Sequence, residues 1–386
     1  MFMIPYGKQD ITQEDIDRVI EVLKSDFITQ GPELPRFEKT ISEYSSSKYA
    51  VAVNSATSAL HIACLALDLG PGDWMWTSPN TFVASANCGL YCGAKVDFVD
   101  IDPRSYNMSV ELLQQKLEVA ELAGKLPKIV IPVHFAGQSC DMKDIRNLAD
   151  KYGFKIIEDA SHAIGGSYLG KSIGNCEFSD ITIFSFHPVK IITTAEGGVA
   201  TTNNELVAEK LRRLRSHGVT RDDRFMQGDI DGPWTYQQVE LGFNYRMTDI
   251  QAALGCSQMK RLGEYVKTRH DICEKYNRLL SDSPLILPWQ NPDSYSALHL
   301  YPVQIKDECK VNRLQVFESM RCQGVGVNVH YIPVHTQPFY KNLGFKMKDF
   351  PNSVKYYQRT ISLPVFSSLN EDEQLKVVNS LKMSLS

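Results

Sequence analysis

The sequence has little of several features that would assign it to a familiar class. No apolar run approaches the roughly 20 residues that a helix needs to cross a bilayer. The N-terminal stretch MFMIPYGKQD lacks the apolar centre of a signal peptide. The net charge is also small, because 41 basic residues against 45 acidic residues leave −4. We therefore expect a cytoplasmic protein that binds neither membranes nor nucleic acid.

Motifs for metals and nucleotides are missing or incomplete. The nine cysteines form no C-x-x-C pair, and no histidine follows Cys88 and Cys92 at zinc-ligand spacing, so we expect free thiols and no metal. No G-x-G-x-x-G follows the first apolar run. Residues 165–172, GGSYLGKS, fit the phosphate-loop formula of nucleotide triphosphatases, but turn residues follow where that loop needs a helix. We expect a glycine-rich hairpin there.

The features that are present indicate an α/β fold. With 386 residues, of which 43% are hydrophobic, the chain is too long for one core of typical size, so we expect a large and a smaller domain. Between residues 49 and 159, short apolar runs alternate with helical stretches. This rhythm predicts a mainly parallel sheet with helices on both faces, and the apolar runs are those of strands covered on both sides.

Three helical or irregular segments complete the outline. Residues 12–26 predict an amphipathic helix with an apolar stripe of Ile16, Val19, Ile20 and Leu23. Residues 217–237 are polar and contain glycine and proline, which predicts a long loop. From Thr248 to about Leu280 the pattern predicts one long helix.

Three polar sites follow predicted strands. Small hydroxyl residues in VNSATSALH come after Val53, where they could bind a phosphate or simply cap a helix. Glu158 and Asp159 end another strand, where a carboxylate could face a ligand or cap a loop. Lys190 lies in SFHPVKIITTAEGG, between an apolar run and a glycine pair. A lysine, a carboxylate and a phosphate site are the minimal parts of a pyridoxal phosphate site; without the other two, Lys190 would be an exposed loop lysine.

The chain resembles the DegT/DnrJ/StrS family of sugar-nucleotide aminotransferases along nearly its whole length. The resemblance is carried by the segments NSATSALH, PNTFVASAN, EDASHAIGG, SFHPVKIITTAEGG, RSHG, GFNYRMTDIQAALG and VHYIPVHTQPFY. It implies a pyridoxal-phosphate transferase of fold type I that works as a homodimer with shared active sites. The implied parts are an N-terminal arm and first helix (1–30), a large mainly parallel cofactor domain (31–250), and a linking helix with a small C-terminal α+β domain (251–386).

The resemblance also implies roles for individual residues. Lys190 would form the Schiff base, Asp159 would pair with the pyridine nitrogen, His162 would lie near the 3-hydroxyl, and Phe82 would stack on the ring. The cofactor phosphate would be held by Thr57, Ser58, Ser185 and, from the other subunit, Asn244, and Ala56 would also bind the cofactor. The segments that match the sugar-nucleotide site contribute Tyr6, Asp26, Phe27, Ile28, Thr29, Ala56, Ser185, Asn244, Asn328, Val329, His330 and Tyr331.

Within the family, SATSAL, TTAEGG and SDFITQG are most similar to the transaminases of pseudaminic acid synthesis. This implies that L-glutamate leaves its amine on the cofactor as pyridoxamine phosphate. The amine would then go to C4 of a UDP-linked 4-keto-6-deoxy-N-acetylhexosamine, UDP-2-acetamido-2,6-dideoxy-β-L-arabino-hex-4-ulose. The alternatives are an aminotransferase for another UDP- or dTDP-4-keto sugar and a catalytically silent cofactor- or nucleotide-binding regulator. A phosphotransferase would rest on GGSYLGKS alone.

Overall fold

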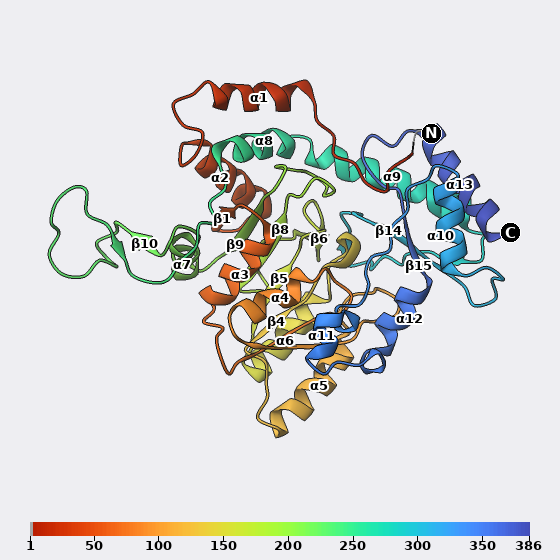
Figure 1. The fold of residues 1–386 in the computed structure, drawn as a ribbon, viewed down its shortest axis with the longest axis horizontal. Coiled ribbons are helices and arrows are strands. Elements are labelled where there is room, and N and C mark those ends of the chain that lie inside the picture. The colour runs from red at the N-terminus through yellow and green to blue at the C-terminus, as the bar shows by residue number, and fades with distance from the viewer. Residues whose placement is uncertain (1–2) are drawn as a thin grey trace.

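A seven-stranded sheet lies at the centre of the computed structural model, which describes residues 3–386 (Figure 1). Its order is β1-β9-β8-β5-β4-β2-β3. The strands are β1 (Tyr49–Val53), β2 (Trp74–Thr77), β3 (Lys95–Phe98), β4 (Ile129–Ile131), β5 (Lys155–Asp159), β8 (Ile181–Ser185) and β9 (Gly198–Thr202). Strands β3, β2, β4, β5 and β8 run parallel, whereas β9 is antiparallel to both of its neighbours. The predicted mainly parallel sheet is confirmed.

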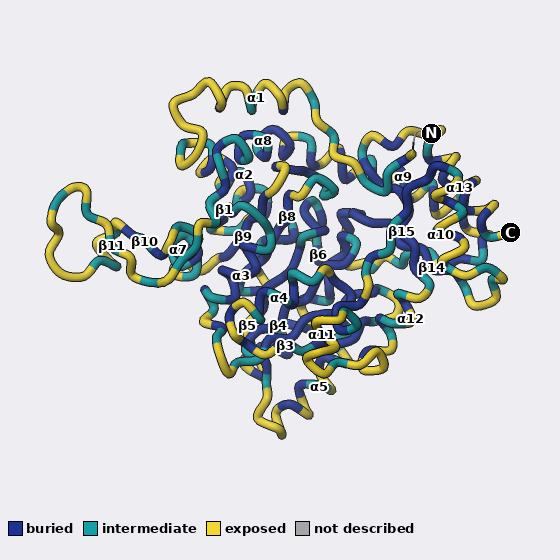
Figure 2. Tube along the Cα trace, viewed as in Figure 1, coloured by how far each residue is buried: buried dark blue, intermediate teal, exposed yellow. Residues whose placement is uncertain are grey.

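Both faces of the sheet are covered, because successive side chains of a strand point to opposite sides. In β1, Val51 and Val53 belong to a core cluster with α3 (Ala56–Ala66), α4 (Ala84–Tyr91) and α7 (Glu205–Arg215). Ala50 and Ala52 belong to a second cluster with α2 (Glu33–Ser45), α8 (Asp249–Met259) and α9 (Leu262–Leu280). A third cluster involves α5 (Val110–Leu122) and α6 (Met142–Tyr152). Figure 2 shows the strands as the buried interior.

The predicted long helix from Thr248 is interrupted, so that prediction is wrong in one detail. Helix α8 ends at Met259 and α9 begins at Leu262. Between them the amides of Lys260 and Arg261 bond to carbonyls three residues back, which tightens the turn and ends the α-helical ladder. The side chain of Arg261 is held by Asp15 of α1 (Gln13–Leu23), 2.6 Å away.

The apolar stripe predicted for α1 is only partly used inside the chain. Helix α1 packs along α8 and buries Val22, which is outside the predicted stripe, while Val19 of the stripe is half-buried. Ile16, Ile20 and Leu23, however, are 43%, 38% and 56% exposed. Figure 2 shows the outer side of α1 as exposed. Much of the stripe therefore faces away from the core of its own chain.

Two segments that the sequence marks as irregular form short antiparallel pairs. GGSYLGKS is a hairpin of β6 (Ser167–Tyr168) and β7 (Lys171–Ser172), as predicted, so the phosphate-loop interpretation is wrong. The loop after α7 pairs β10 (Val219–Thr220) with β11 (Gln237–Gln238) and projects from the body as a long arm (Figure 1).

The C-terminal segment has a sheet of β12 (Leu285–Ile286), β14 (Tyr301–Ile305) and β15 (Thr360–Leu363). The helices around it are α10 (Arg313–Cys322), α12 (Pro351–Arg359) and α13 (Glu371–Leu385). Helix α11 (Pro338–Asn342) instead packs on the central sheet through Tyr340, whose hydroxyl donates to Asn87 of α4 at 2.6 Å. One apolar cluster combines residues of this segment with Ile4, which forms an isolated bridge with Val325. We propose that this segment forms the smaller domain that the sequence predicts.

Two expectations about absent features can be compared with the fold. Across residues 3–386, no helix combines the length and the apolar character needed to cross a membrane. The nine cysteines are all free thiols. Six of them are buried, Cys256 and Cys309 are half-buried, and Cys322 is exposed.

Candidate active site

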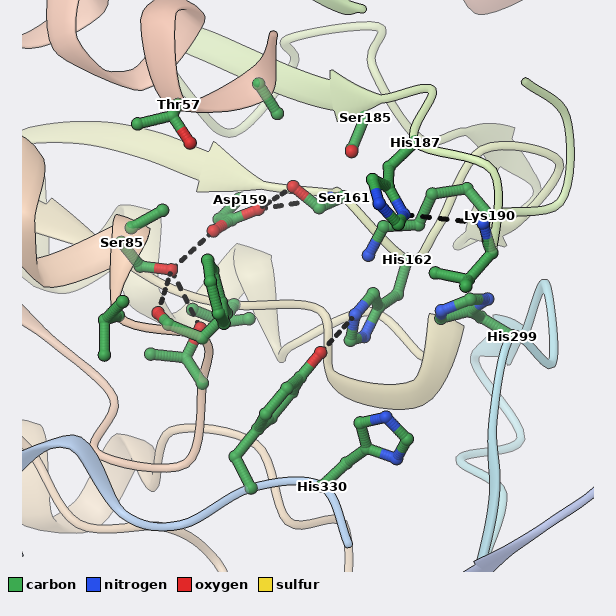
Figure 3. Close-up of a pocket in the computed structure, with 18 of the residues that line it drawn as sticks. Thr57, Ser85, Asp159, Ser161, His162, Ser185, His187, Lys190, His299 and His330 are labelled. Atoms are coloured by element: carbon green, nitrogen blue, oxygen red, sulfur yellow. Dashed lines mark hydrogen bonds between the residues drawn. The ribbon is translucent and has the colours of Figure 1, made fainter. Parts of the chain in front are cut away.

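A cavity of about 650 Å³ opens at the carboxyl ends of β5 and β8 (Figure 3). Ligands in open α/β sheets bind at these strand ends. Twelve residues predicted from the sequence line the cavity: Tyr6, Ala56, Thr57, Phe82, Asp159, His162, Ser185, Lys190, Asn328, Val329, His330 and Tyr331. They come from six separate parts of the chain, which the sheet and the C-terminal segment bring together.

Asp159 ends β5 and turns its carboxylate into the cavity, where it is 4% exposed. Ser85 of α4 donates to one carboxylate oxygen at 2.6 Å. Ser161 donates to the other, from its hydroxyl at 2.6 Å and its backbone amide at 3.1 Å. An ionised carboxylate only accepts hydrogen bonds, so three converging donors suit that form. The carboxylate is thereby fixed in one orientation.

Glu158, the other candidate carboxylate, faces away from the cavity. It accepts a hydrogen bond from His134 at 2.7 Å and others from Ser179 and Thr182. Burial opposes its charge, but these hydrogen bonds and the charge of His134 hold the pKa of Glu158 below its ordinary value. Because neighbouring residues of a strand point to opposite faces, only one of the pair can serve the cavity. Glu158 anchors the structure and Asp159 faces the ligand space.

Lys190 lies just beyond β8, in a turn closed by its amide and the carbonyl of His187 at 2.9 Å. Burial lowers the pKa of its amine to about 8, although the charge of Asp159 acts in the opposite direction. The glycine pair after it has a packing reason. A Cβ on Gly198 would lie 2.5 Å from the backbone nitrogen of Ala56, so glycine lets β9 pass beside the start of α3.

The start of α3 presents backbone amides to the cavity. Ser55 is its N-cap, and its side chain accepts from the amide of Ser58 at 3.1 Å. Ala56 and Thr57 line the cavity and occupy the first turn, where amides have no carbonyl partner within the helix. These amides and the helix dipole favour an anion such as a phosphate. Ser185 lines the same cavity.

His162 lies between Lys190 and the C-terminal segment (Figure 3). Its Nε2 is 3.0 Å from the hydroxyl of Tyr331, and its buried Nδ1 has no partner among the described residues. Burial, followed by the charge of Lys190, lowers the pKa of His162 well below its ordinary value, so the ring is neutral. His162 therefore lines the cavity as a neutral ring that is held by Tyr331.

Six predicted residues lie outside this cavity. Ser58 is buried and donates to Asn54 at 2.7 Å, so it belongs to the cap of α3. Residues 26–29 lie in the loop after α1, with Phe27 55% and Ile28 52% exposed. Asn244 is exposed and forms an isolated bridge with Ser216 at the base of the arm. It does not cap α8, because Thr248 occupies that position.

The sequence analysis missed several residues that shape the cavity. Ser85 and Ser161 orient Asp159, and His299 places its ring 4.5 Å from that of His162. Ser161 had a detectable signal, since a serine two residues after an aspartate at a strand end commonly bonds back to it. Ser85 and His299 gave no local signal, because their neighbours in space are distant in sequence. His187, Glu196 and Gln337 also line the cavity.

The residues present fit pyridoxal phosphate. An amine with a lowered pKa suits a bond to the aldehyde, and an oriented carboxylate suits the pyridine nitrogen. The first turn of α3 suits the phosphate, and the ring of His162 borders the same space. Phe82, which is 60% exposed, offers an aromatic face to the same space. Among residues 3–386, no group of three or more His, Cys, Asp or Glu side chains could hold a metal ion.

The lowered pKa of Lys190 gives a test on the cofactor-free protein. Only the neutral amine reacts with an acylating reagent, so labelling of Lys190 should rise with pH with a midpoint near 8. A lysine in a model peptide has a pKa of about 10.4. Asp159→Asn removes the charge that raises the pKa of Lys190, so the midpoint should move to lower pH. Mass spectrometry of the labelled peptide measures this, and an upward shift in Asp159→Asn would contradict the geometry.

The fold and the cavity define a pyridoxal-phosphate-dependent transferase of fold type I. The chain matches the DegT/DnrJ/EryC1/StrS aminotransferase family over residues 9–382 and belongs to that family. It is therefore an aminotransferase that uses pyridoxal phosphate.

Similar proteins include a UDP-4-amino-4,6-dideoxy-N-acetyl-beta-L-altrosamine transaminase of Campylobacter jejuni. It is 37% identical over 95% of this chain and 94% of the relative. Among solved structures, the sugar aminotransferase Spr1654 of Streptococcus pneumoniae in its PMP form has a TM-score of 0.90 and 30% identity, over 99% of this chain and 98% of that chain. Helicobacter pylori PseC, an aminotransferase of pseudoaminic acid biosynthesis, has a TM-score of 0.90 and 29% identity, over 99% of both chains.

Proposed function

We propose that this enzyme transfers an amino group from L-glutamate to C4 of a UDP-linked 4-keto-6-deoxy-N-acetylhexosamine. The observation that carries the proposal is one cavity that holds Lys190, Asp159 and the start of α3 together. The choice of sugar is supported by the printed names of the Campylobacter and Helicobacter relatives. A related sugar is the second candidate, because a UDP-4-amino-4-deoxy-L-arabinose–oxoglutarate aminotransferase is 34% identical.

When bound, the cofactor supplies a carbonyl carbon that carries the amino group and a ring that accepts electrons. In this proposal Lys190 Nζ removes the proton from the α-carbon of glutamate. In the second half of the cycle it delivers a proton to C4 of the sugar. An amine with a pKa near 8 can both accept and donate a proton near neutral pH, as general acid–base catalysis requires.

The other cavity residues orient the reactants in this proposal. Asp159 holds the positive ring nitrogen, and Ser85 and Ser161 keep its carboxylate in position. His162, held by Tyr331, would lie beside a substituent of the cofactor ring. Tyr6 and the segment 328–331 form the wall toward which the sugar nucleotide would bind.

A panel of purified nucleotide 4-keto sugars tests the substrate. The holoenzyme is incubated with each sugar and with glutamate carrying a heavy nitrogen isotope, and the products are analysed by mass spectrometry. We expect the label in the amino sugar made from the UDP-linked N-acetylated ketone. Preference for a dTDP sugar or a pentose would support the second candidate. A silent regulator would bind cofactor but show no change in its absorbance with glutamate.

We also propose that the enzyme is a homodimer whose active sites are shared. The exposed apolar side chains of α1, with Phe27 and Ile28 after it, give a second copy a surface to cover. Asn244 lies outside the cavity of its own chain, at the base of the projecting arm. The apolar surface would allow two copies to associate, and the position of Asn244 would allow it to reach the cofactor of the partner subunit.

Mixed dimers test the shared site. Lys190→Ala and Asn244→Asp should each be inactive alone, the second because its negative charge repels the cofactor phosphate. If Asn244 acts across the interface, one site of a mixed dimer carries both lesions and the other carries neither. Activity should then return to about half of the wild-type value per dimer. Asn342→Asp, an equally exposed change on α11, is the control and should retain cofactor. Verified subunit exchange without activity would place Asn244 in its own site.

A further inference from the structure

Arg269 is a buried arginine without a carboxylate partner. It lies on α9 and is only 2% exposed. None of the ion pairs among residues 3–386 includes it. Burial lowers the pKa of Arg269 to about 10, which reflects the cost of a cation in an apolar interior. Replacing a buried charge by an apolar residue of similar volume often leaves the stability of a protein unchanged or raises it. Stability alone therefore does not explain an arginine at this position.

The guanidinium donates to carbonyls of two segments that reach the active site. Its Nη1 is 3.4 Å from the carbonyl oxygen of Leu298, 3.3 Å from that of His299 and 3.0 Å from that of Val365. His299 lines the cavity. The amide of Val365 in turn donates to the carbonyl of Tyr6, another cavity residue, at 3.2 Å. Arg269 thus connects the segment that carries His299 with the segment that holds Tyr6, and it lies on the side of both that faces away from the cavity.

The turn that Arg269 holds is a strained one. Leu298 has a φ of +47°, in the left-handed region that is unfavourable for a residue with a side chain. The turn lies directly against Gly137, where an added Cβ would be 2.8 Å from the amide nitrogen of Leu298 and 3.0 Å from that of His299. The amide of Ala297 donates to Gly137 at 3.0 Å. Strain of this kind persists where the surroundings enforce it, and it concentrates at functional sites.

The turn sets the position of the His299 ring. This ring lies 4.5 Å from the ring of His162, and both rings lie beside Lys190 (Figure 3). Two unfavourable features, the buried cation of Arg269 and the left-handed backbone of Leu298, therefore meet at the segment that carries His299. We propose that Arg269 is a positioning residue of the amino-transfer reaction, which holds the Leu298 turn so that His299 stays against His162. The inference rests on the proposed role of the Lys190 cavity.

Arg269→Met tests the proposal, since methionine fills much of the volume without the charge or the hydrogen bonds. We expect the melting temperature to stay close to wild type and kcat to fall at least about tenfold, with a smaller change in KM. In the cofactor-free protein, hydrogen exchange of the amides of Ala297 and Leu300 should become faster. Arg278→Met, which changes an exposed arginine later on α9, is the control and should change neither kcat nor the exchange rates of these amides.

A double variant separates positioning from a general structural role. If Arg269 acts through His299, the loss in kcat for Arg269→Met with His299→Gln should match the worse single variant, because coupled residues are not additive. Multiplied losses, a wild-type kcat in Arg269→Met, or unchanged exchange at the turn would each overturn the proposal. If the methionine variant does not fold, Arg269→Lys is measured in the same way, since lysine keeps the charge but lacks the rigid planar guanidinium that places Nη1 among the three carbonyls. The exchange readout does not need substrate, so it remains informative if the proposed sugar is wrong.

Discussion

Lys190→Ala should lower transamination by about a thousandfold or more, within the range attributed to positioned acid–base groups and increased by the loss of the bond to the cofactor. The amine is the proton carrier of the proposed reaction, and alanine has no group to replace it. The fold should survive, because the Lys190 side chain forms no ion pair or hydrogen bond with the residues that the structure describes and borders a cavity rather than the core. Steady-state kinetics and thermal melting measure the two effects.

The matched control for this variant is Lys39→Ala on α2, whose side chain is 75% exposed. It should leave both the rate and the melting temperature unchanged. Lys190→Ala should still bind pyridoxamine phosphate without a covalent bond, since the start of α3 and Asp159 are intact. A well-folded Lys190→Ala enzyme that turns over at an appreciable rate would refute the role of Lys190.

Asp159→Asn should lower kcat by about a hundredfold or more, a loss typical of removing one electrostatic group from an active site. An amide carries no charge to balance a positive ring nitrogen, and its NH₂ group cannot accept from Ser85 or Ser161. Cofactor retention should change less, because the phosphate contacts remain. Kinetics and equilibrium dialysis of the cofactor measure the two quantities separately.

Glu158→Gln is the informative neighbour for this experiment. It changes an adjacent carboxylate on the opposite face of β5, where His134, Ser179 and Thr182 surround it. Glu158→Gln should clearly lower the melting temperature and leave kcat close to the wild-type value. If instead Asp159→Asn keeps a near-normal rate, Asp159 is a structural cap and the cofactor ring lies elsewhere.

The sequence identified the parts of the site whose position follows from local rules. Asp159 and Lys190 follow strands, and the carboxyl ends of parallel strands meet at one edge of a sheet. The start of α3 was visible from small hydroxyl residues after a strand. Two further predicted features, the glycine-rich hairpin and the sheet covered on both faces, depend on equally local patterns.

The contacts between distant segments could not be predicted in the same way. Ser85 reaches Asp159 across 74 positions of the chain, and Arg269 reaches Val365 across 96. The break at Lys260 and Arg261 depends on tertiary contact with α1, which overrides a continuous helical pattern. Family resemblance predicted that Asn244 serves the cofactor of the other subunit, and this stays a prediction because local patterns in the sequence carry no information about contacts between subunits.

The opposite orientation of Glu158 and Asp159 has a consequence for enzyme engineering. The backbone of β5 acts as a partition between two hydrogen-bond networks that begin at adjacent residues. Ser85 and Ser161 can therefore be altered to tune the electronic properties of the cofactor while the His134 network keeps the strand end in register. A directed-evolution library restricted to those two serines would explore reactivity with little risk to the scaffold.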